Sequence, residues 1–259
     1  MSDWSWPALI AHRCGGALAP ENTLAGLGIA ARLGCVAVEF DVMLSGDGVP
    51  VLIHDETLER TAGRRGEVFR LSAEALQATD VGCRFHPAFS GETIPRLEAA
   101  LSRCFQLGLA ANLEIKPAAG FEVDTGRTVG RLLAGIGPGG LPPLLLSSFS
   151  EQALEAAAAE VEDLPRAFLA ERFDVGALTT AVRLSCVSLN LGRQGLQAAQ
   201  VAAVRDAGLR TLVYTVNAPD EARSLTEWGV VGVFSDRPDL LLTAPASPDA
   251  GTAASIQSA

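Results

Sequence analysis

Eight short apolar segments, most of them separated by helical stretches, constrain the fold of this chain more than any other feature of its sequence. Each segment ends in polar residues, and the stretches between them are rich in Ala and Leu. Strands that alternate with helices predict a parallel sheet, and eight such units in about 250 residues are typical of a TIM (β/α)8 barrel. The predicted strands are Ala8–Arg13, Val36–Leu44, Ala111–Lys116, Leu144–Ser148, Arg166–Ala170, Cys186–Asn190, Arg210–Val216 and Val230–Asp236.

A doubly wound open sheet is the alternative fold, because periodicity alone does not show that a sheet closes. No Gly-rich dinucleotide or phosphate-loop fingerprint follows the first strand, which disfavours it. After the second strand, an Asp-Gly turn leads into Val49–His54 and predicts a β-hairpin. A polar insertion of about residues 56–94 follows. We therefore expect one barrel domain over residues 1–244 and a disordered tail over 245–259, which is rich in small and polar residues.

Composition excludes several classes of protein. The chain has 259 residues, of which 48% are hydrophobic, and its net charge is −10. A sizeable core is therefore expected, and general binding of nucleic acid is disfavoured because it needs a basic surface. The N-terminus lacks the basic and apolar pattern of a secretory signal, and no apolar run approaches the roughly 20 residues of a membrane span. Five cysteines without a C-x-x-C pair indicate free thiols and a cytoplasmic location.

Three carboxylates on two predicted strands indicate a metal site. Side chains alternate along a strand, so Glu39 and Asp41 face the barrel interior together. Glu114, on the next barrel strand, repeats this arrangement. Buried carboxylates repel one another, and an all-oxygen group suits one hard divalent cation, Mg²⁺ or Ca²⁺, better than zinc. Arg13 and Lys116 add positive charge beside the group, which indicates an anionic small-molecule substrate.

Two of the three histidines lie at the ends of predicted strands. His12 closes the first strand and His54 closes the return strand of the hairpin, so both should reach the carboxyl-terminal rim, where barrels carry their active sites. Imidazoles there are candidates for acid–base catalysis. For either histidine alone, a structural hydrogen-bonding role would be the simpler interpretation. His86, in the insertion, is expected to be structural.

These residues, in this order and spacing, resemble the glycerophosphodiester phosphodiesterases, and the absence of a signal sequence is similar to the cytoplasmic bacterial type. The resemblance extends over nearly the whole chain before the tail. Its later part covers Leu146–Phe149, Tyr214–Asn217 and Gly229–Asp236. Its central motifs are His12-Arg13, Pro20-Glu21-Asn22-Thr23, Glu39-Phe40-Asp41, His54-Asp55, Leu58-Glu59-Arg60-Thr61 and Glu114-Ile115-Lys116.

The resemblance implies metal-dependent cleavage of glycerophosphodiesters to glycerol 3-phosphate and an alcohol. It implies one divalent metal on Glu39, Asp41 and Glu114, and a phosphate held by two basic residues, Arg13 and Lys116. His12 and His54 would be the acid–base pair, with His12 removing a proton and His54 protonating the leaving group. The sequence leaves the reverse assignment open, and it does not reveal the head group or the oligomeric state.

Three departures from the family pattern, at Cys14, Tyr214 and Val231, and two alternative functions remain, and the departure at Cys14 bears most on the site. The family usually has Gly where Cys14 stands, so its side chain could crowd the phosphate loop or be open to oxidation. A phospholipase D-like or inositol-phospholipid-cleaving barrel would need a membrane-docking surface, for which the scarce aromatics give little support. Its candidate residues are Trp4, Trp6, Phe69, Phe85 and Phe89. The other alternative is a barrel that binds a phosphodiester without cleaving it. We expect no stable membrane association.

Overall fold

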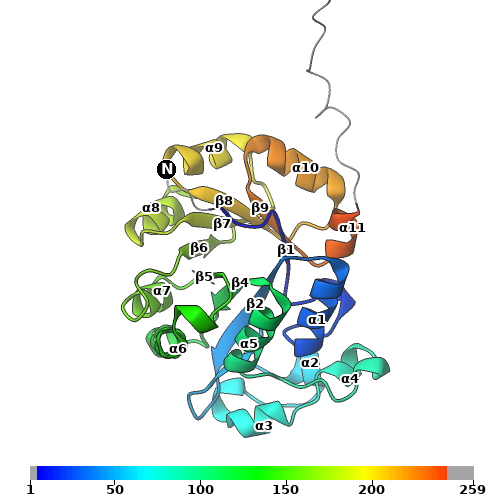
Figure 1. The fold of residues 1–259 in the computed structure, drawn as a ribbon. Coiled ribbons are helices and arrows are strands. Elements are labelled where there is room, and N and C mark those ends of the chain that lie inside the picture. The colour runs from blue at the N-terminus through cyan, green and yellow to red at the C-terminus, as the bar shows by residue number, and fades with distance from the viewer. Residues whose placement is uncertain (1–4, 244–259) are drawn as a thin grey trace, which may run out of the picture.

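Eight parallel strands close into a barrel in the computed structural model, which describes residues 5–243 (Figure 1). The ring closes where β1 pairs with both β9 and β2, and β3 lies outside it, antiparallel to β2. The predicted TIM barrel is thus confirmed. Trp4 and the tail over 245–259 lie outside the described residues. The strands are β1 (Leu9–Ala11), β2 (Ala37–Leu44), β3 (Pro50–Leu52), β4 (Ala110–Ile115), β5 (Leu144–Ser148), β6 (Arg166–Ala170), β7 (Ser188–Gly192), β8 (Arg210–Tyr214) and β9 (Gly232–Ser235).

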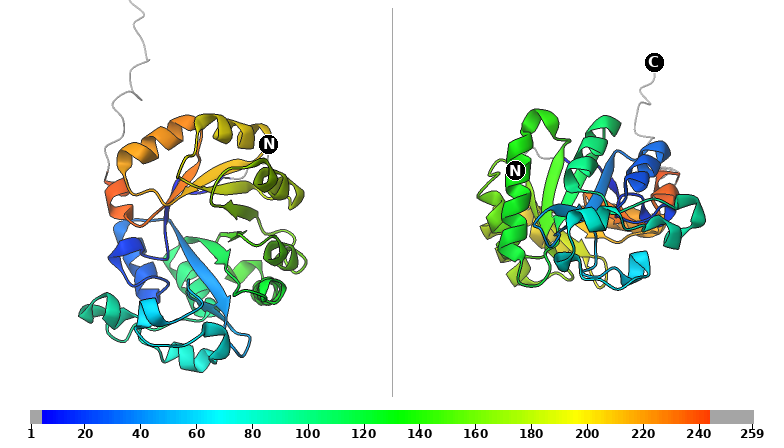
Figure 2. Two further views of the ribbon diagram at one scale, coloured as in Figure 1. Left: turned by 180° about the vertical axis from the view of Figure 1, so that it is seen from behind. Right: turned by 90° about the horizontal axis from the view of Figure 1, so that it is seen from below.

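Helices surround the strands, as Figures 1 and 2 show from opposite sides. Within residues 5–243, no helix is both long and apolar enough to cross a membrane. The helices are α1 (Leu24–Leu33), α2 (Glu59–Ala62), α3 (Ala73–Gln77), α4 (Gly82–Phe85), α5 (Leu97–Leu107), α6 (Glu122–Ile136), α7 (Glu151–Ala158), α8 (Val175–Arg183), α9 (Ala198–Asp206), α10 (Pro219–Trp228) and α11 (Pro238–Leu242).

Two predicted strands begin two residues too early: β9 starts at Gly232 and not at Val230, and β7 differs in the same way. The sequence places the start at Cys186, but β7 starts at Ser188. The Cys186 N–H donates to the Ala181 carbonyl and closes the last turn of α8. Ser185 has a φ of 53°, so the chain becomes extended only after this turn. A helix end and a strand start therefore share the apolar residues that the sequence pattern assigns to the strand.

The pleat of β2 divides its residues between two environments. Val38, Phe40 and Val42 point outward and pack in a fully buried cluster with helix residues such as Leu27 and Leu101. The alternate side chains of the same strand face the barrel interior. There, Ile10, Ala37, Ala110, Leu212 and Phe234 form an apolar layer. The polar interior side chains that follow along β2 and β4 therefore lie above this apolar layer.

The insertion after the hairpin folds as short helices with an apolar cluster of its own. Met43 and Val51 of the hairpin, together with Leu58, Val68 and Leu76, are buried in it. In Figures 1 and 2 this cyan segment lies beside the hairpin at one side of the ring. The Ile53 N–H donates to the Asp41 carbonyl, 3.1 Å away, and holds the end of the hairpin against β2. Residue 54 is thereby held at the carboxyl-terminal rim.

Two glycines of α6 give a matched test of helix packing. A Cβ at Gly126 would lie 2.1 Å from the Ala153 carbonyl oxygen of α7, whereas a Cβ at Gly135 would meet nothing within 4 Å. We expect Gly126→Ala to lower the free energy of unfolding by about 1–3 kcal/mol because the backbones must separate. Gly135→Ala should raise it by up to about 1 kcal/mol through helix propensity. Urea denaturation measures both, and a shift of the same sign in the two variants would contradict this packing.

Candidate active site

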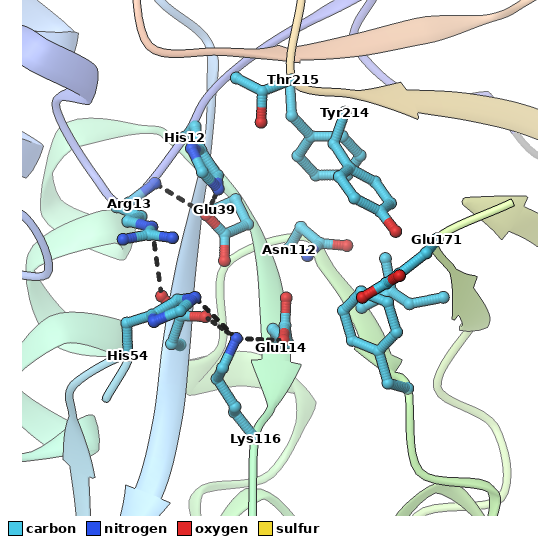
Figure 3. A pocket seen from close by; sticks show the side chains of 14 residues that line it. His12, Arg13, Glu39, His54, Asn112, Glu114, Lys116, Glu171, Tyr214 and Thr215 are labelled. Carbon is cyan, nitrogen blue, oxygen red and sulfur yellow. Dashed lines mark hydrogen bonds and ion pairs between the residues drawn. The ribbon is translucent and has the colours of Figure 1, made fainter. Parts of the chain in front are cut away.

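A cavity of about 430 Å³ opens at the carboxyl-terminal rim of the barrel (Figure 3). The structure brings together there all seven residues that the sequence singles out, from the ends of β1, β2, β4 and the hairpin. The lining residues are His12, Arg13, Glu39, Asp41, His54, Asn112, Glu114, Lys116, Phe149, Leu169, Glu171, Tyr214, Thr215 and Phe234.

The acidic group is compact and buried. Glu39, Asp41 and Glu114 each offer a carboxylate oxygen, and these oxygens lie within 4.8 Å of one another. The β2–β4 register places Asp41 directly beside Glu114. The three side chains are at most 11% exposed. This convergence follows from the pleat and the register alone, because alternate residues of adjacent parallel strands share the interior face.

Burial and mutual repulsion make this group unfavourable without positive charge. Burial, followed by the charges of Asp41 and Glu114, raises the pKa of Glu39 well above its usual range. Burial also raises the pKa of Glu114, to about 7. For Asp41, burial acts in the same direction, but Lys116, His54 and Arg13 outweigh it and lower its pKa. Each carboxylate therefore depends on a cation nearby.

Two basic side chains supply part of that charge. The Lys116 Nζ lies 3.3 Å from Glu114 Oε1 and 3.5 Å from Asp41 Oδ1. The Arg13 backbone N–H donates to Glu39 Oε2 at 2.7 Å, and its guanidinium Nε lies 4.0 Å from Asp41. Two cations leave one of three carboxylate charges uncompensated. Glu39 Oε1 is also buried without a hydrogen-bond partner among the described residues. An unpartnered buried oxygen in an acidic, all-oxygen group fits a hard divalent cation.

Each histidine of the pocket is oriented by its own carboxylate. His12 Nδ1 lies 2.6 Å from Asp236 Oδ1, and His54 Nδ1 lies 2.6 Å from Asp55 Oδ1. Such a contact favours the proton on Nδ1 and leaves Nε2 to face the pocket. The two Nε2 atoms have neighbours of opposite charge. The Nε2 of His12 lies 3.9 Å from Glu39, and the Nε2 of His54 lies 2.8 Å from Lys116 Nζ. Burial, with the charges of Arg13 and Lys116, lowers the pKa of His54 against the opposing effect of Asp41.

Asn22 is a site residue that the sequence marks only as part of the Pro20-Glu21-Asn22-Thr23 motif, with no role of its own. Thr23 is the N-cap of α1, because its hydroxyl accepts from the Gly26 N–H. The Asn22 amide instead donates to Asp41 Oδ2 at 2.8 Å, and its oxygen accepts from the Asp41 N–H at 3.0 Å. It therefore fixes the carboxylate of Asp41. The preceding residue, Glu21, accepts from both Arg13 and Arg60 and ties the first loop to the insertion.

Asp236 and Glu171 are further pocket or rim residues that were not singled out. Asp236 follows β9 and Glu171 follows β6. The rule that selects His12, namely a polar residue at the end of a barrel strand, applies to both. Asp55 also went unassigned, although it follows His54 directly. Carboxylates at strand ends are common, so the rule alone does not distinguish them from solvated surface residues.

Cys14 and His86 lie away from the chemistry. Cys14 is fully buried in the apolar cluster beneath the loop and does not line the pocket, so it neither crowds the cavity nor is open to oxidation. Burial raises the pKa of its thiol well above the usual range. Its φ of 75° is in the left-handed region, which costs a side chain roughly 1–2 kcal/mol relative to Gly. His86 is exposed and accepts from the Ala88 N–H, as a structural residue would.

Comparisons with known proteins agree on one family. The model of the glycerophosphoryl diester phosphodiesterase family matches residues 12–240. The protein YhdW of Bacillus subtilis is 31% identical over 240 residues, which cover 90% of this chain and 96% of YhdW. A glycerophosphodiester phosphodiesterase of Caldanaerobacter subterraneus is 28% identical over 235 residues, or 90% and 96% of the two chains. A solved Oleispira antarctica phosphodiesterase, in complex with its product sn-glycerol-3-phosphate, is 35% identical, with a TM-score of 0.87 over 92% of this chain and 96% of its own.

Proposed function

This chain belongs to the glycerophosphoryl diester phosphodiesterase family, and from that premise we propose which of its residues bind the substrate and which move the proton. The enzyme is a hydrolase that converts glycerophosphodiesters to glycerol 3-phosphate and an alcohol. One observation carries the assignment of residues. Three buried carboxylates lie between two imidazoles, and both imidazoles line the same cavity, each with its Nδ1 held by another carboxylate.

Arg13 and Lys116 bind the phosphate. Both residues line the cavity. A guanidinium donor facing a cavity is suited to a phosphoryl oxygen. Lys116 contributes a point charge that is free to turn from His54 and Glu114 toward the substrate. Together they stabilise the negative charge that grows on the phosphoryl oxygens in the transition state.

His12 removes the proton from the attacking hydroxyl, and His54 protonates the leaving alkoxide. A base is assisted by neighbours that stabilise its protonated form, and His12 lies beside the carboxylates of Asp236 and Glu39. An acid must carry its proton on Nε2, which His54 can do once Lys116 turns from it toward the phosphate, and the Lys116 charge nearby then favours transfer of that proton to the leaving group. Asp236 and Asp55 hold the two rings in position. The attacking hydroxyl belongs to water, which gives glycerol 3-phosphate directly, or to the substrate's own glycerol, which gives a cyclic phosphate that water then opens to glycerol 3-phosphate.

Glu39, Asp41 and Glu114 would hold one divalent metal ion, Mg²⁺ or Ca²⁺. The described residues include no histidine or cysteine in this group, and carboxylate oxygens suit these hard cations. When bound, the ion polarises the phosphoryl group as a Lewis acid. The protein holds the three carboxylates close together in a buried site, where the basic side chains nearby do not balance all of their negative charge.

Asn22→Gly tests the support of this site. Gly tolerates the left-handed φ of 56° at this position, so the substitution removes the amide without adding strain. We expect the concentration of Mg²⁺ or Ca²⁺ that gives half-maximal activity to rise about 10–100-fold, as is typical when a partner of a metal ligand is lost. Gln106→Ala, at an exposed position of α5, is the control. An unchanged metal requirement in Asn22→Gly would show that Asp41 needs no such support.

Release of glycerol 3-phosphate tests the function as a whole. The enzyme would be incubated with a panel of glycerophosphodiesters, with and without each divalent cation, and the product measured with a coupled dehydrogenase. We expect cation-dependent release from the water-soluble diesters and none from intact phospholipid vesicles. Binding of diesters without release would favour a non-catalytic barrel, and turnover confined to vesicles would favour a lipid-cleaving enzyme.

We also infer a cytoplasmic location and no stable membrane association. All five cysteines are unpaired, which supports a reducing compartment. Co-sedimentation with vesicles would contradict the second inference.

A further inference from the structure

We propose that Glu171 makes this enzyme selective for glycerophosphodiesters whose head group carries a positive charge, such as a quaternary or primary ammonium. The inference rests on the proposed function and concerns the half of the same cavity that the reaction chemistry leaves unused. Glu171 follows β6 and faces the histidines across the cavity in Figure 3.

The charges that line the cavity are divided unevenly between its two halves. The charged residues on β1, β2, β4 and the hairpin, and directly after them, form the metal and phosphate site already described. The opposite wall comes from β5, β6, β8 and β9. Among the residues that line this wall, Glu171 carries the only formal charge, and the others are Phe149, Leu169, Tyr214, Thr215 and Phe234.

Two aromatic rings stand on this wall beside the carboxylate. Phe149 and Tyr214 pack edge to face, with their centroids 5.9 Å apart. The Tyr214 hydroxyl donates to the Ala170 carbonyl at 2.9 Å, so its proton is already engaged. A polyol head group would find few hydrogen-bond partners here. An ammonium group gains from an aromatic wall and a carboxylate, because ring faces attract cations.

The charge of Glu171 is not cancelled within the cavity. The nearest basic residues in the sequence and on the neighbouring strand, Arg172 and Arg193, line an adjoining cavity that Glu171 also lines, but neither forms an ion pair with Glu171. The Arg193 guanidinium is paired with Glu221 at 3.2 Å. Within the described part of the chain, Glu171 itself has no ion pair. Its carboxylate is therefore available to a ligand.

The two halves also fix the direction in which a diester lies. Glycerol hydroxyls need hydrogen-bond partners, and the polar side chains of the charged half offer more of these than the aromatic half does. The apolar, aromatic half suits the methylenes and methyl groups of an amino alcohol. With the phosphate at Arg13, the head group then extends toward Glu171.

Paired substrates test this selectivity. In wild type and Glu171→Gln, kcat/KM would be measured for glycerophosphocholine and for glycerophosphoglycerol, whose head group is neutral. We expect Glu171→Gln to lower the value for glycerophosphocholine about 5–30-fold and to leave that for glycerophosphoglycerol within about twofold. Glu227→Gln, which removes the same charge from an exposed position of α10, should change neither.

A second measurement uses the leaving group alone. Choline should inhibit the wild type more strongly than its uncharged isostere 3,3-dimethylbutan-1-ol, and Glu171→Gln should abolish the difference. An equal loss for both diesters, or unchanged kcat/KM for both, would overturn the inference while the function stands. If the wild type released no glycerol 3-phosphate from either diester, the proposed function itself would fail.

Discussion

Replacement of His12 or His54 by Ala is expected to lower kcat by about 10²–10⁴-fold, the usual contribution of general acid–base catalysis. Each ring is held by a carboxylate and directs its other nitrogen into the cavity. The loss should appear mainly in kcat, because Arg13 and Lys116 remain to bind the phosphate. His86→Ala, in the insertion, is the control and should turn over normally. Near-normal kcat in both His12→Ala and His54→Ala would refute the assignment.

An activated substrate separates the two roles. A p-nitrophenyl ester of glycerol 3-phosphate has a leaving group that departs without a proton. We expect it to restore most of the activity of His54→Ala and little of that of His12→Ala, because the base is still required. Rescue of His12→Ala instead would reverse the roles and leave the pair intact.

Removal of the metal, or of one of its ligands, should have an effect of similar size. Exhaustive chelation and Glu39→Gln are each expected to reduce kcat/KM by about 10²–10⁴-fold, since stabilisation by a metal is worth several kcal/mol. Glu98→Gln, at an exposed position of α5, is the control variant. Full activity of the wild type after chelation would exclude a metal-dependent reaction.

The same variant should have the opposite effect on the metal-free fold. Because the pKa of Glu39 is raised above 4.5, the folded state holds a proton that the unfolded state releases. Stability of the metal-free wild type should therefore fall as the pH rises from about 4.5 toward the higher folded pKa. Glu39→Gln removes that dependence. Its metal-free melting temperature at pH 8 should exceed that of the wild type by roughly 2–8 °C, while added Mg²⁺ should stabilise it less. Equal metal-free melting curves for the wild type and Glu39→Gln at pH 8 would contradict the repulsion among the three carboxylates.

Much of this site is predictable from the sequence because local rules determine it. The pleat places Glu39 and Asp41 on one face, and the carboxyl ends of parallel strands meet at one rim. Those two rules bring His12 and Glu114 to the same cavity. The hairpin turn returns His54 to that rim. Each of these inferences needs only the strand boundaries, which the apolar pattern gives within about two residues.

The supporting residues depend on distances that no local pattern encodes. The contact of Asn22 with Asp41 needs a left-handed residue in the first loop, and His12 meets Asp236 only because the ring closes between β1 and β9. The start of β7 is misplaced because the last turn of α8 uses the same apolar residues. The position of Glu171 has meaning only against the charges of the whole cavity, which residues on or directly after several strands contribute.

The division of the cavity has a consequence for how such an enzyme can diversify. Apart from Asp236, the groups that perform the reaction lie within the first 116 residues, and the wall that meets the head group comes from later strands. Mutations from β5 onward can therefore change the substrate preference while the proposed metal, phosphate and acid–base residues of the earlier strands stay the same. A chimera that joins β1–β4 of this chain to the strands of a relative from β5 onward should exchange substrate preference in a single step.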